Sequence, residues 1–399
     1  MGLSARANHK GSTRLGSYLR RLRTGYGYSL RRVEERARAE GGEIDNSQLS
    51  RYEKGICYPS FDKLRVLASV FNVSIQSFSD VVDLEGYEEF KPDAGDATEL
   101  IEDGIAVLRQ GNNGQAFAFF ERALEIATEM PLNDETMELV GRIRVNQAAA
   151  LRRLGKLSLA EQELRHAMRN GEHLSGTLRA RALLALAGVH GDLGDNFLSE
   201  MEAERAYEIA RVENLDRLGA MALHTLARVL YDQSRFAEAI ERYREAARLY
   251  AACDEHYESI RVRINISACY VRLGKSREGI RLLRSSLGEA RAGGHRRMEA
   301  FAWSNLGKAY FHMKENQRAR GCFRESDALA VYNNEKQPEI LFINAFHEWK
   351  ISAQEENPTR EKIAFGRLKA LRSGLEQRLP EVVAFDEFVE RGRSHAKAL

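Results

Sequence analysis

Four polar side chains have the types and spacing to form hydrogen bonds from one side of a short helix. The stretch DNSQLSRYEKG begins with Asp45, which can cap a helix by accepting a backbone N–H, and ends with Gly55, which can close one in the left-handed conformation. Leu49 and Tyr52 have the spacing of a buried face. The open side carries Asn46, Ser47, Ser50 and Arg51. Such a set can hydrogen-bond a polyanion and contains no carboxylate to repel it.

Basic residues are concentrated in the first fifth of the chain. Through Val82 the sequence has 14 Lys or Arg and 8 Asp or Glu, a net charge of +6, whereas the whole chain has +2 and the remainder therefore −4. Local positive charge of this kind attracts nucleic acid. At 399 residues the chain is too long for one ordinary domain.

The positions of the cysteines and the hydropathy of the sequence argue against metal-binding, secreted and membrane-spanning classes of protein. The cysteines are Cys57, Cys253, Cys269 and Cys322, and their positions lack the spacing of metal ligands. The sequence shows no apolar signal region and no long apolar run. We therefore expect a reduced, cytoplasmic protein with no metal, no cofactor and no membrane contact.

Helical spacing of apolar residues predicts a compact all-α domain over residues 13–82. Five short helical segments occur there, and several follow a residue that can cap a helix, namely Ser29, Asp45, Ser60 and Ser74. The order of these segments resembles the Cro/cI-type helix-turn-helix domains, which bind DNA. The resemblance runs from about Leu15 to Val82, with SLRRVEERA as the second helix, DNSQLSRYEKG as the recognition helix and YPSFDKLRVLASVFNVSIQSF as the closing pair.

The resemblance implies roles for individual residues. Base edges in the major groove would be contacted by Asn46, Ser47, Gln48 and Arg51, although Gln48 could instead be occupied at the helix cap. Phosphates would be held by Ser29, Arg31, Lys54 and Lys63. An arginine of the first helix pairs in this family with the glutamate that ends the recognition helix, which corresponds to a structural pair of Arg23 and Glu53.

One connection departs from the family pattern. The segment RARAEGGEI between the second and third helices is longer than the family's tight turn. Either the second helix runs on for a turn, or Gly41 and Gly42 form a bulged loop. The angle of the recognition helix depends on which of these occurs.

The rest of the chain is periodic. A small residue recurs in steps of 39 to 44 residues, at Ala116, Ala160, Ser199, Ala239, Gly279 and Ala319. A second series of small residues precedes it, at Gly104, Ala148, Ala187, Ala227, Ser267 and Gly307. Small residues at fixed positions let paired helices approach closely, while an aromatic residue or leucine fills the gap between them.

This pattern resembles tetratricopeptide repeats. The sixth repeat matches best, through Trp303, Leu306, Gly307, Tyr310, Ala319 and Phe323. The period exceeds the usual 34 residues, so longer helices are expected. Residues 339–352 and 360–375 resemble a degenerate seventh pair, and residues 380–391 resemble a capping helix. The expected fold is all-α, with a five-helix lambda-repressor-like domain followed by a right-handed superhelical solenoid.

These patterns divide the sequence into five segments. We predict a flexible basic arm at 1–12, the helix-turn-helix domain at 13–82, an acidic linker at 83–98, the repeat domain at 99–392 and a tail at 393–399. The segment that follows Val82 is rich in Asp and Glu, with Lys91 as its single base up to Asp103. This acidity can keep the linker off DNA.

The resemblance to tetratricopeptide repeats implies a ligand groove lined by the first helix of each pair. Asparagine recurs at a favoured contact position and can clamp the backbone of an extended peptide, while neighbouring basic residues suit a carboxylate. The candidate groove residues are Arg142, Asn146, Arg181, Thr225, Arg228, Arg261, Asn265, Arg272, Asn305, Lys308 and His312. The alternative is that these residues are ordinary solvated helix faces of an arginine-rich protein.

Together the two domains resemble bacterial regulators that sense short peptides, the group containing Rgg, NprR, PlcR and PrgX. The resemblance implies a homodimer that binds an inverted-repeat operator in double-stranded DNA and responds to a short peptide or a protein in the groove. The alternative is a protein-interaction scaffold with a vestigial or weakly DNA-binding helix-turn-helix. His190, His224 and His312 are isolated in sequence from any catalytic or metal-binding cluster, so we do not expect an enzyme.

Overall fold

The chain forms two compact units, which are described separately. The computed structural model describes residues 11–332, 335–375 and 379–397, so most of the predicted arm and the end of the predicted tail lie outside the described residues. One unit ends at His173 and the other begins at Leu174. Apart from the two-residue strands β1 (Val331–Tyr332) and β2 (Glu335–Lys336), the regular structure described is helical, which confirms the all-α prediction.

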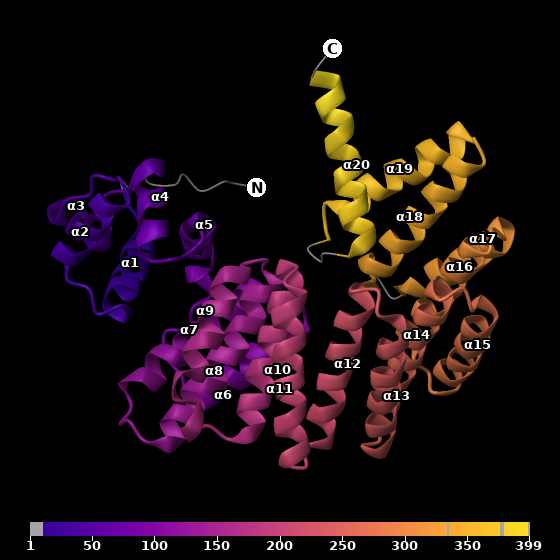
Figure 1. Ribbon diagram of the computed structural model, residues 1–399, viewed down its shortest axis with the longest axis horizontal. Helices are drawn as coiled ribbons and strands as arrows, with labels where there is room; N and C mark the ends of the chain where they lie inside the picture. The colour runs from indigo at the N-terminus through magenta and orange to yellow at the C-terminus, as the bar shows by residue number, and fades with distance from the viewer. Residues whose placement is uncertain (1–10, 333–334, 376–378, 398–399) are drawn as a thin grey trace. The chain divides into compact units, whose positions relative to one another are not determined.

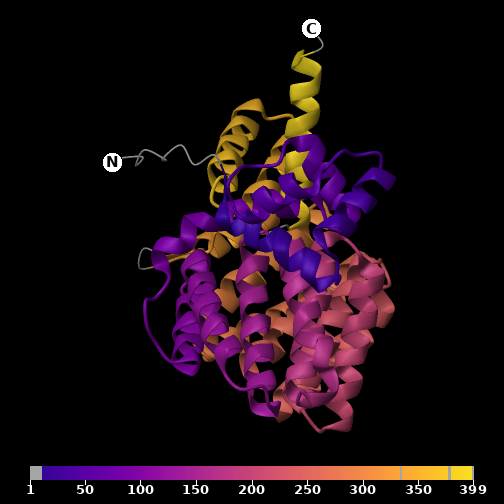
Figure 2. The same cartoon turned by 90° about the vertical axis from the view of Figure 1, so that its left-hand side faces the viewer.

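The first unit contains a small helical domain followed by two helical pairs. The small domain comprises α1 (Thr13–Gly25), α2 (Leu30–Ala39), α3 (Asn46–Glu53), α4 (Phe61–Val70) and α5 (Ile75–Asp83). The 3-10 helix η1 (Leu84–Phe90) leads to the pairs α6 (Ala97–Arg109) with α7 (Asn113–Glu129) and α8 (Asp134–Arg153) with α9 (Leu157–Ala167), and η2 (Met168–His173) follows. Figures 1 and 2 show α6 to α9 side by side.

Local side-chain contacts explain where the helices of the small domain begin. At the start of four helices a side-chain oxygen of the preceding residue accepts a backbone N–H. The residues that provide this oxygen are Ser12, Ser29, Asp45 and Ser74. Ser60 precedes α4 without such a bond. The predicted helix starts in this domain therefore follow from residues adjacent in sequence.

The long connection before α3 is an ordered loop. Helix α2 continues to Ala39, and Gly41 follows in the left-handed region at φ +75°. A Cβ on Gly42 would lie 2.4 Å from the side chain of Val66, so the loop packs closely on α4. Ile44 is buried and anchors the chain just before α3.

Helices α1 and α3 cross at a glycine. A Cβ on Gly16 would lie 2.6 Å from the carbonyl oxygens of Tyr52 and Glu53, so no larger residue fits without separating the helices. Leu19 and Leu49 are fully buried beside this crossing. The close approach makes the position of α3 depend directly on that of α1.

The second unit continues the paired arrangement. Its helices are α10 (Gly176–Leu193), α11 (Asn196–Val212), α12 (Asp216–Asp232), α13 (Phe236–Ala252), α14 (His256–Arg272), α15 (Ser276–Ala292), α16 (Arg296–His312), α17 (Asn316–Ala330), α18 (Pro338–Gln354), α19 (Pro358–Arg372) and α20 (Pro380–Lys397). Consecutive helices pack on one another from α10 to α19, and α20 packs on α18 (Figure 1).

The recurring small residues bring paired helices together. A Cβ on Gly104 of α6 would lie 2.5 Å from the ring of Phe120 in α7, and one on Gly307 of α16 would lie 2.4 Å from the ring of Phe323 in α17. Both rings are almost fully buried. In these two pairs an aromatic side chain of the second helix occupies the space that the glycine of the first helix leaves open.

Replacing Gly307 with alanine is expected to lower the free energy of unfolding by about 1–3 kcal/mol, because the methyl group overlaps the Phe323 ring. The control is Gly321→Ala in α17, where an added Cβ meets nothing within 4 Å. That change should stabilise the helix by roughly 0.5–1 kcal/mol. Urea unfolding of both variants measures the contrast, and equal stabilities would contradict the packing role.

Candidate functional site

Asp45 holds the N-terminus of α3. Its Oδ1 accepts the hydroxyl of Ser47 and the backbone N–H of Gln48, each at 2.7 Å. These hydrogen bonds, that of Ser47 first, lower the pKa of the Asp45 carboxyl. Ser47 thus donates its proton to the cap and keeps its oxygen lone pairs as acceptors for another partner.

Two of the predicted DNA-contacting residues contact each other. The Lys63 Nζ donates to the Gln48 Oε1 at 2.7 Å and to the backbone carbonyl of Glu43 at 2.8 Å. The carbonyl oxygen of the Gln48 side chain is therefore occupied. Its partner is Lys63, and not a backbone N–H at the helix cap, the alternative that the sequence left open. The Gln48 amide nitrogen keeps its two N–H donors, which can reach the acceptor atoms of a base.

Asn46 and Arg51 of α3 and Lys54 just after it are exposed, whereas Ser50, also predicted on the open side, is half-buried. Leu49 and Tyr52 are buried on the opposite side. A carboxylate oxygen of Glu34 lies 3.3 Å from the backbone nitrogen of Asn46. The helix thus presents amide, hydroxyl and guanidinium groups on one accessible side.

The predicted phosphate contacts on α2 are also accessible. The Ser29 hydroxyl oxygen accepts the backbone N–H of Arg32 at 3.1 Å, and its own proton remains available. The Arg31 side chain is 85% exposed and lies 3.7 Å from Glu35. Such a weak surface pair leaves Arg31 able to exchange partners.

Arg23 and Glu53 form the expected ion pair between α1 and α3. The Arg23 Nε and Nη2 donate to the two carboxylate oxygens of Glu53 at 2.6 and 2.9 Å, and its Nη1 donates to the carbonyl of Tyr28 at 2.9 Å. The side chains are only 15% and 8% exposed. The hydrogen bond to Glu53 raises the pKa of Arg23. This bidentate contact fixes one end of α3 against α1.

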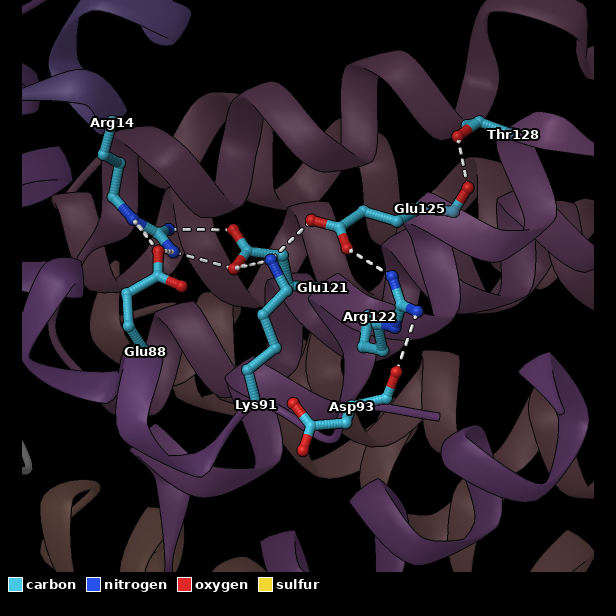
Figure 3. A network of polar contacts seen from close by, with 8 residues as sticks. All are labelled: Arg14, Glu88, Lys91, Asp93, Glu121, Arg122, Glu125 and Thr128. Carbon is cyan, nitrogen blue, oxygen red and sulfur yellow. Dashed lines mark hydrogen bonds and ion pairs between the residues drawn. The ribbon is translucent and has the colours of Figure 1, made fainter. Parts of the chain in front are cut away.

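A network of ion pairs joins the small domain to the first helical pair (Figure 3). Arg14 of α1 donates to both carboxylate oxygens of Glu121 in α7, at 2.8 and 2.7 Å, and also contacts Glu88 of η1. Lys91 lies 3.3 Å from Glu121 and 2.5 Å from Glu125. The segment predicted as an acidic linker is therefore held against α7 at these points.

A buried carboxylate joins the small domain to α9. The Glu163 side chain is 6% exposed and pairs with Arg144 of α8 and, at 3.3 Å, with Arg21 of α1. Burial raises the pKa of Glu163, but Arg21 and Arg144 outweigh it, so the pKa lies below its ordinary value. Next to it, the Tyr18 hydroxyl donates to Gln162 at 3.0 Å.

A third charged contact attaches α5 to the start of α9. The Nζ of Lys156, just before α9, lies 3.0 Å from the Asp80 carboxylate and 2.6 Å from that of Asp83. Together with the Arg14 and Glu163 contacts, it holds α1 and α5 against the repeats. Because α3 packs on α1, these contacts set the orientation of α3 relative to α6–α9.

The predicted groove residues fall in both units. Arg142 and Asn146 lie on α8 in the first unit. The second unit carries the rest, which are Arg181, Thr225, Arg228, Arg261, Asn265, Arg272, Asn305, Lys308 and His312. Asn146 is buried, and in the described structure its Nδ2 and the Nε of Arg142 have no hydrogen-bond partner.

In the second unit, α12 and α14 bring together a cluster around His224. The His224 ring nitrogens lie 3.1 Å from the Nδ2 of Asn265 and 3.4 Å from the Nη2 of Arg261. Burial, followed by the charges of Arg261 and Arg228, lowers the pKa of His224 to about 3. A neutral imidazole is therefore expected at physiological pH. The Arg261 Nη2 lies 2.6 Å from the Glu258 carboxylate, so the charge of Arg261 is already paired, and Arg228 adds a second positive charge near the ring.

His224 belongs to the candidate groove, although sequence reasoning did not include it there. It appeared isolated, yet it contacts two predicted groove residues from the next first helix along the chain. Its position immediately before Thr225, itself a groove candidate, was the available signal. The Thr225 hydroxyl and the Asn305 amide nitrogen instead donate to carbonyls of their own helices, at 3.0 and 2.9 Å.

A second cluster involves α14 and α16, with Phe236 of α13 beside it. The Arg272 guanidinium lies 5.0 Å from the ring centre of Phe236. Burial, followed by the charges of Lys308 and Arg272, lowers the pKa of His312. The Lys308 ammonium forms an ion pair with the carboxylate of Glu381 in α20. Two basic clusters therefore lie on first helices of the second unit.

The described residues contain no group of His, Cys, Asp and Glu that could hold a metal ion. Among the same residues, no helix is long and apolar enough to cross a membrane.

Comparison with protein families supports the two kinds of domain. Residues 19–78 match the family model described as helix-turn-helix, and residues 178–252 match the one described as tetratricopeptide repeat. Comparison with curated proteins gives no significant match. The chain therefore combines a helix-turn-helix domain with tetratricopeptide repeats.

Several solved structures share the repeat fold. A tetratricopeptide repeat protein from Parabacteroides merdae is 17% identical over 70% of this chain and 94% of its own, with a TM-score of 0.50. NprR in complex with its cognate peptide NprX is 13% identical over 73% and 84%, with a TM-score of 0.52. The apo form of the quorum sensor NprR from B. thuringiensis is 13% identical over 72% and 79%, with a TM-score of 0.50.

Proposed function

We propose that this protein is a sequence-specific DNA-binding transcriptional regulator that acts as a homodimer and responds to a short peptide or protein bound by its repeats. The observation that carries the proposal is the open side of α3, where Asn46 and Arg51 are exposed above a buried Leu49. The Asp45 cap and the Arg23–Glu53 pair hold that side in place. NprR, which shares the repeat fold, was solved with its cognate peptide, and this supports the sensing role.

Each exposed group of α3 has a suitable partner on DNA. Arg51 can donate two hydrogen bonds to guanine O6 and N7, and Asn46 can pair with adenine. Lys54 and Arg31 suit phosphates, which position a protein on the duplex without reading its sequence. Two such domains related by a two-fold axis would read an inverted repeat.

The repeat face supports a ligand that carries a carboxylate. Arg228 and Arg261 lie near a neutral His224 on α12 and α14, and Arg261 is paired with Glu258 at 2.6 Å, so a ligand carboxylate would bind Arg228 or replace Glu258 at Arg261. The Asn265 side chain stands beside it and can hydrogen-bond a peptide amide. A peptide with an acidic side chain or a free C-terminus fits both features.

The function is tested by selecting bound sequences from a random DNA library with the purified full-length protein. Near-physiological salt is needed, because phosphate contacts alone give affinity at low salt. Recovery of an inverted repeat supports a dimeric regulator. A protein that enriches no sequence but copurifies with a stoichiometric protein partner is instead an interaction scaffold.

Arg51→Ala is expected to weaken binding to the selected site by about 1–3 kcal/mol and to relax the preference at one base pair. The matched control is Lys54→Ala, which removes a phosphate contact from the same surface. It should weaken binding to all sequences alike and reduce the salt dependence by about one unit of slope. Titration of both variants at several salt concentrations measures this, and unchanged affinity of Arg51→Ala would contradict the base contact.

A further inference from the structure

Helix α20 places a carboxylate on a basic part of the repeat array. The Glu381 Oε1 lies 2.9 Å from the Nζ of Lys308 in α16 and 3.5 Å from the Nε2 of His347 in α18. The side chains of Glu381 and His347 are each only 9% exposed. Lys308 is one of the predicted groove residues, so part of the predicted ligand face is already occupied by the chain itself.

The surroundings of this ion pair favour an anion. Burial lowers the pKa of Lys308, but the Glu381 carboxylate outweighs it and raises the pKa overall. Burial raises the pKa of Glu381, but Lys308 and His347 outweigh it and keep the carboxyl ionised. The positive charge of Arg272 lowers the pKa of Lys308, and the charges of Lys308 and Arg272 lower the pKa of His312. Removing the carboxylate would leave a half-buried ammonium, 30% exposed, without its partner and near the charge of Arg272, which is unfavourable.

The rest of α20 binds through an apolar side and through Asp386, which accepts hydrogen bonds from Arg372 of α19 at 2.9 Å. Val382 and Phe385 are each 2% exposed, in one cluster with Trp349 of α18. The ring centre of Phe388 lies 4.8 Å from that of Trp349, although Phe388 itself is 50% exposed. Val382, Phe385 and Phe388 recur at every third position of α20, as the apolar residues do in an amphipathic peptide helix bound in a groove.

We propose that α20 is an internal ligand of the repeat array, and that an acidic amphipathic peptide competes with it for Lys308 and His347. The proposal rests on the proposed ligand-sensing role of the repeats, because Lys308 and His312 belong to the predicted groove. A peptide that extends along the first helices to α16 must displace Glu381. The free energy of the α20 contacts then reduces the apparent affinity, since only the fraction of molecules with α20 released can bind there.

The probe is a fluorescently labelled peptide with the sequence of residues 379–391 of this chain, LPEVVAFDEFVER. Its affinity is measured by fluorescence polarisation for the full-length parent and for full-length Glu381→Gln, which keeps the side-chain shape but loses the charge. We expect binding to Glu381→Gln to be at least about tenfold tighter, because a larger fraction of molecules has α20 released. The matched control is Glu387→Gln, on the same helix but 56% exposed and paired with the exposed Arg391, which should bind like the parent.

Further measurements follow the release of α20, and one of them, the hydrogen exchange of the parent protein, does not depend on that variant. The chain has two tryptophans, so in Trp303→Phe the remaining Trp349 reports on α20 through its contact with Phe388. Excess unlabelled peptide should increase the backbone hydrogen exchange of residues 380–391 in the full-length protein. The acrylamide quenching of Trp349 in Trp303→Phe/Glu381→Gln should exceed that in Trp303→Phe. Adding Lys308→Met to Glu381→Gln should abolish binding of the probe.

Equal affinity of the probe for parent and Glu381→Gln would overturn the proposal. So would hydrogen exchange of α20 that stays unchanged under peptide excess. Neither measurement involves DNA, so a negative result here leaves the operator selection unaffected, and failure of that selection leaves these results standing.

Discussion

Replacing Glu163 with alanine is expected to lower the free energy of unfolding of the first unit by about 3–5 kcal/mol. The carboxylate is 6% exposed and pairs with Arg144 and Arg21. The Arg144 side chain is only 18% exposed and would be left with a buried, unpaired charge. Arg21 is 49% exposed and can be hydrated, so most of the loss arises at Arg144.

The measurement is urea unfolding followed by circular dichroism, with the earliest transition as the readout, because a chain of two units need not unfold in one step. The control is Glu161→Ala on the same helix, a residue whose ion pair with the 62% exposed Arg165 is expected to contribute about 0–1 kcal/mol. Similar stability losses in the two variants would show that the Glu163 contacts are no stronger than a surface pair.

The Glu163 contribution should also depend on pH. Its pKa in the folded protein lies below the ordinary value of 4.5, because Arg21 and Arg144 outweigh the effect of burial. A carboxyl of this kind adds stability that is complete above the unfolded-state pKa and is lost as the pH falls through the folded-state pKa. The difference in stability between the parent and Glu163→Ala should therefore be constant near neutral pH and shrink progressively below about pH 4.5.

The second large effect is expected at the Arg23–Glu53 pair. Glu53→Ala leaves the Arg23 guanidinium, 15% exposed, without the carboxylate that accepts two of its hydrogen bonds. The expected loss is about 3–5 kcal/mol in the stability of the helix-turn-helix domain. Binding to the selected operator should fall with it, although Glu53 contacts no base in the proposed complex.

A double variant separates the structural role from a DNA contact. Arg23→Met/Glu53→Leu replaces the ion pair with apolar groups of similar volume, a change that is often neutral for stability. It should recover both the folding and the operator affinity that Glu53→Ala loses. Glu35→Ala, which removes a 47% exposed partner of Arg31 and Arg32, serves as the surface control. A double variant that folds but does not bind DNA would assign one of the two residues to the DNA interface.

Both changes act on the orientation of α3 rather than on the residues that would read bases. Arg23 and Glu53 fix α3 against α1, while Glu163 and its partners fix α1 against α8 and α9. A change in the first repeats therefore has a direct structural route to the recognition helix. The route consists of charged contacts, so operator affinity in the Glu163 variant should be reduced without any loss of base preference.

Several features could be predicted from the sequence because their causes lie within a few residues. The Asp45 cap acts three positions away on Gln48, and Gly55 ends α3 in the left-handed conformation. The small residues recur at nearly constant spacing, and in several repeats an aromatic residue or leucine stands at a fixed distance from them, as Phe323 does from Gly307, so the periodicity shows in the sequence. The Arg23–Glu53 pair was predictable only because its helix order resembles a known family.

The partners of the other charged residues were decided by the tertiary structure alone. Lys308 and Glu381 are 73 positions apart, and Arg14 and Glu121 are 107 positions apart. A charged residue has the same identity whether it is solvated or paired, and its partner depends on how distant helices pack. For this reason the sequence by itself determined the helices, their ends and the repeat period. Only the tertiary structure shows that Glu88, in the predicted acidic linker, forms an ion pair with Arg14. It likewise shows that Lys308, a predicted groove residue, forms an ion pair with Glu381 of α20.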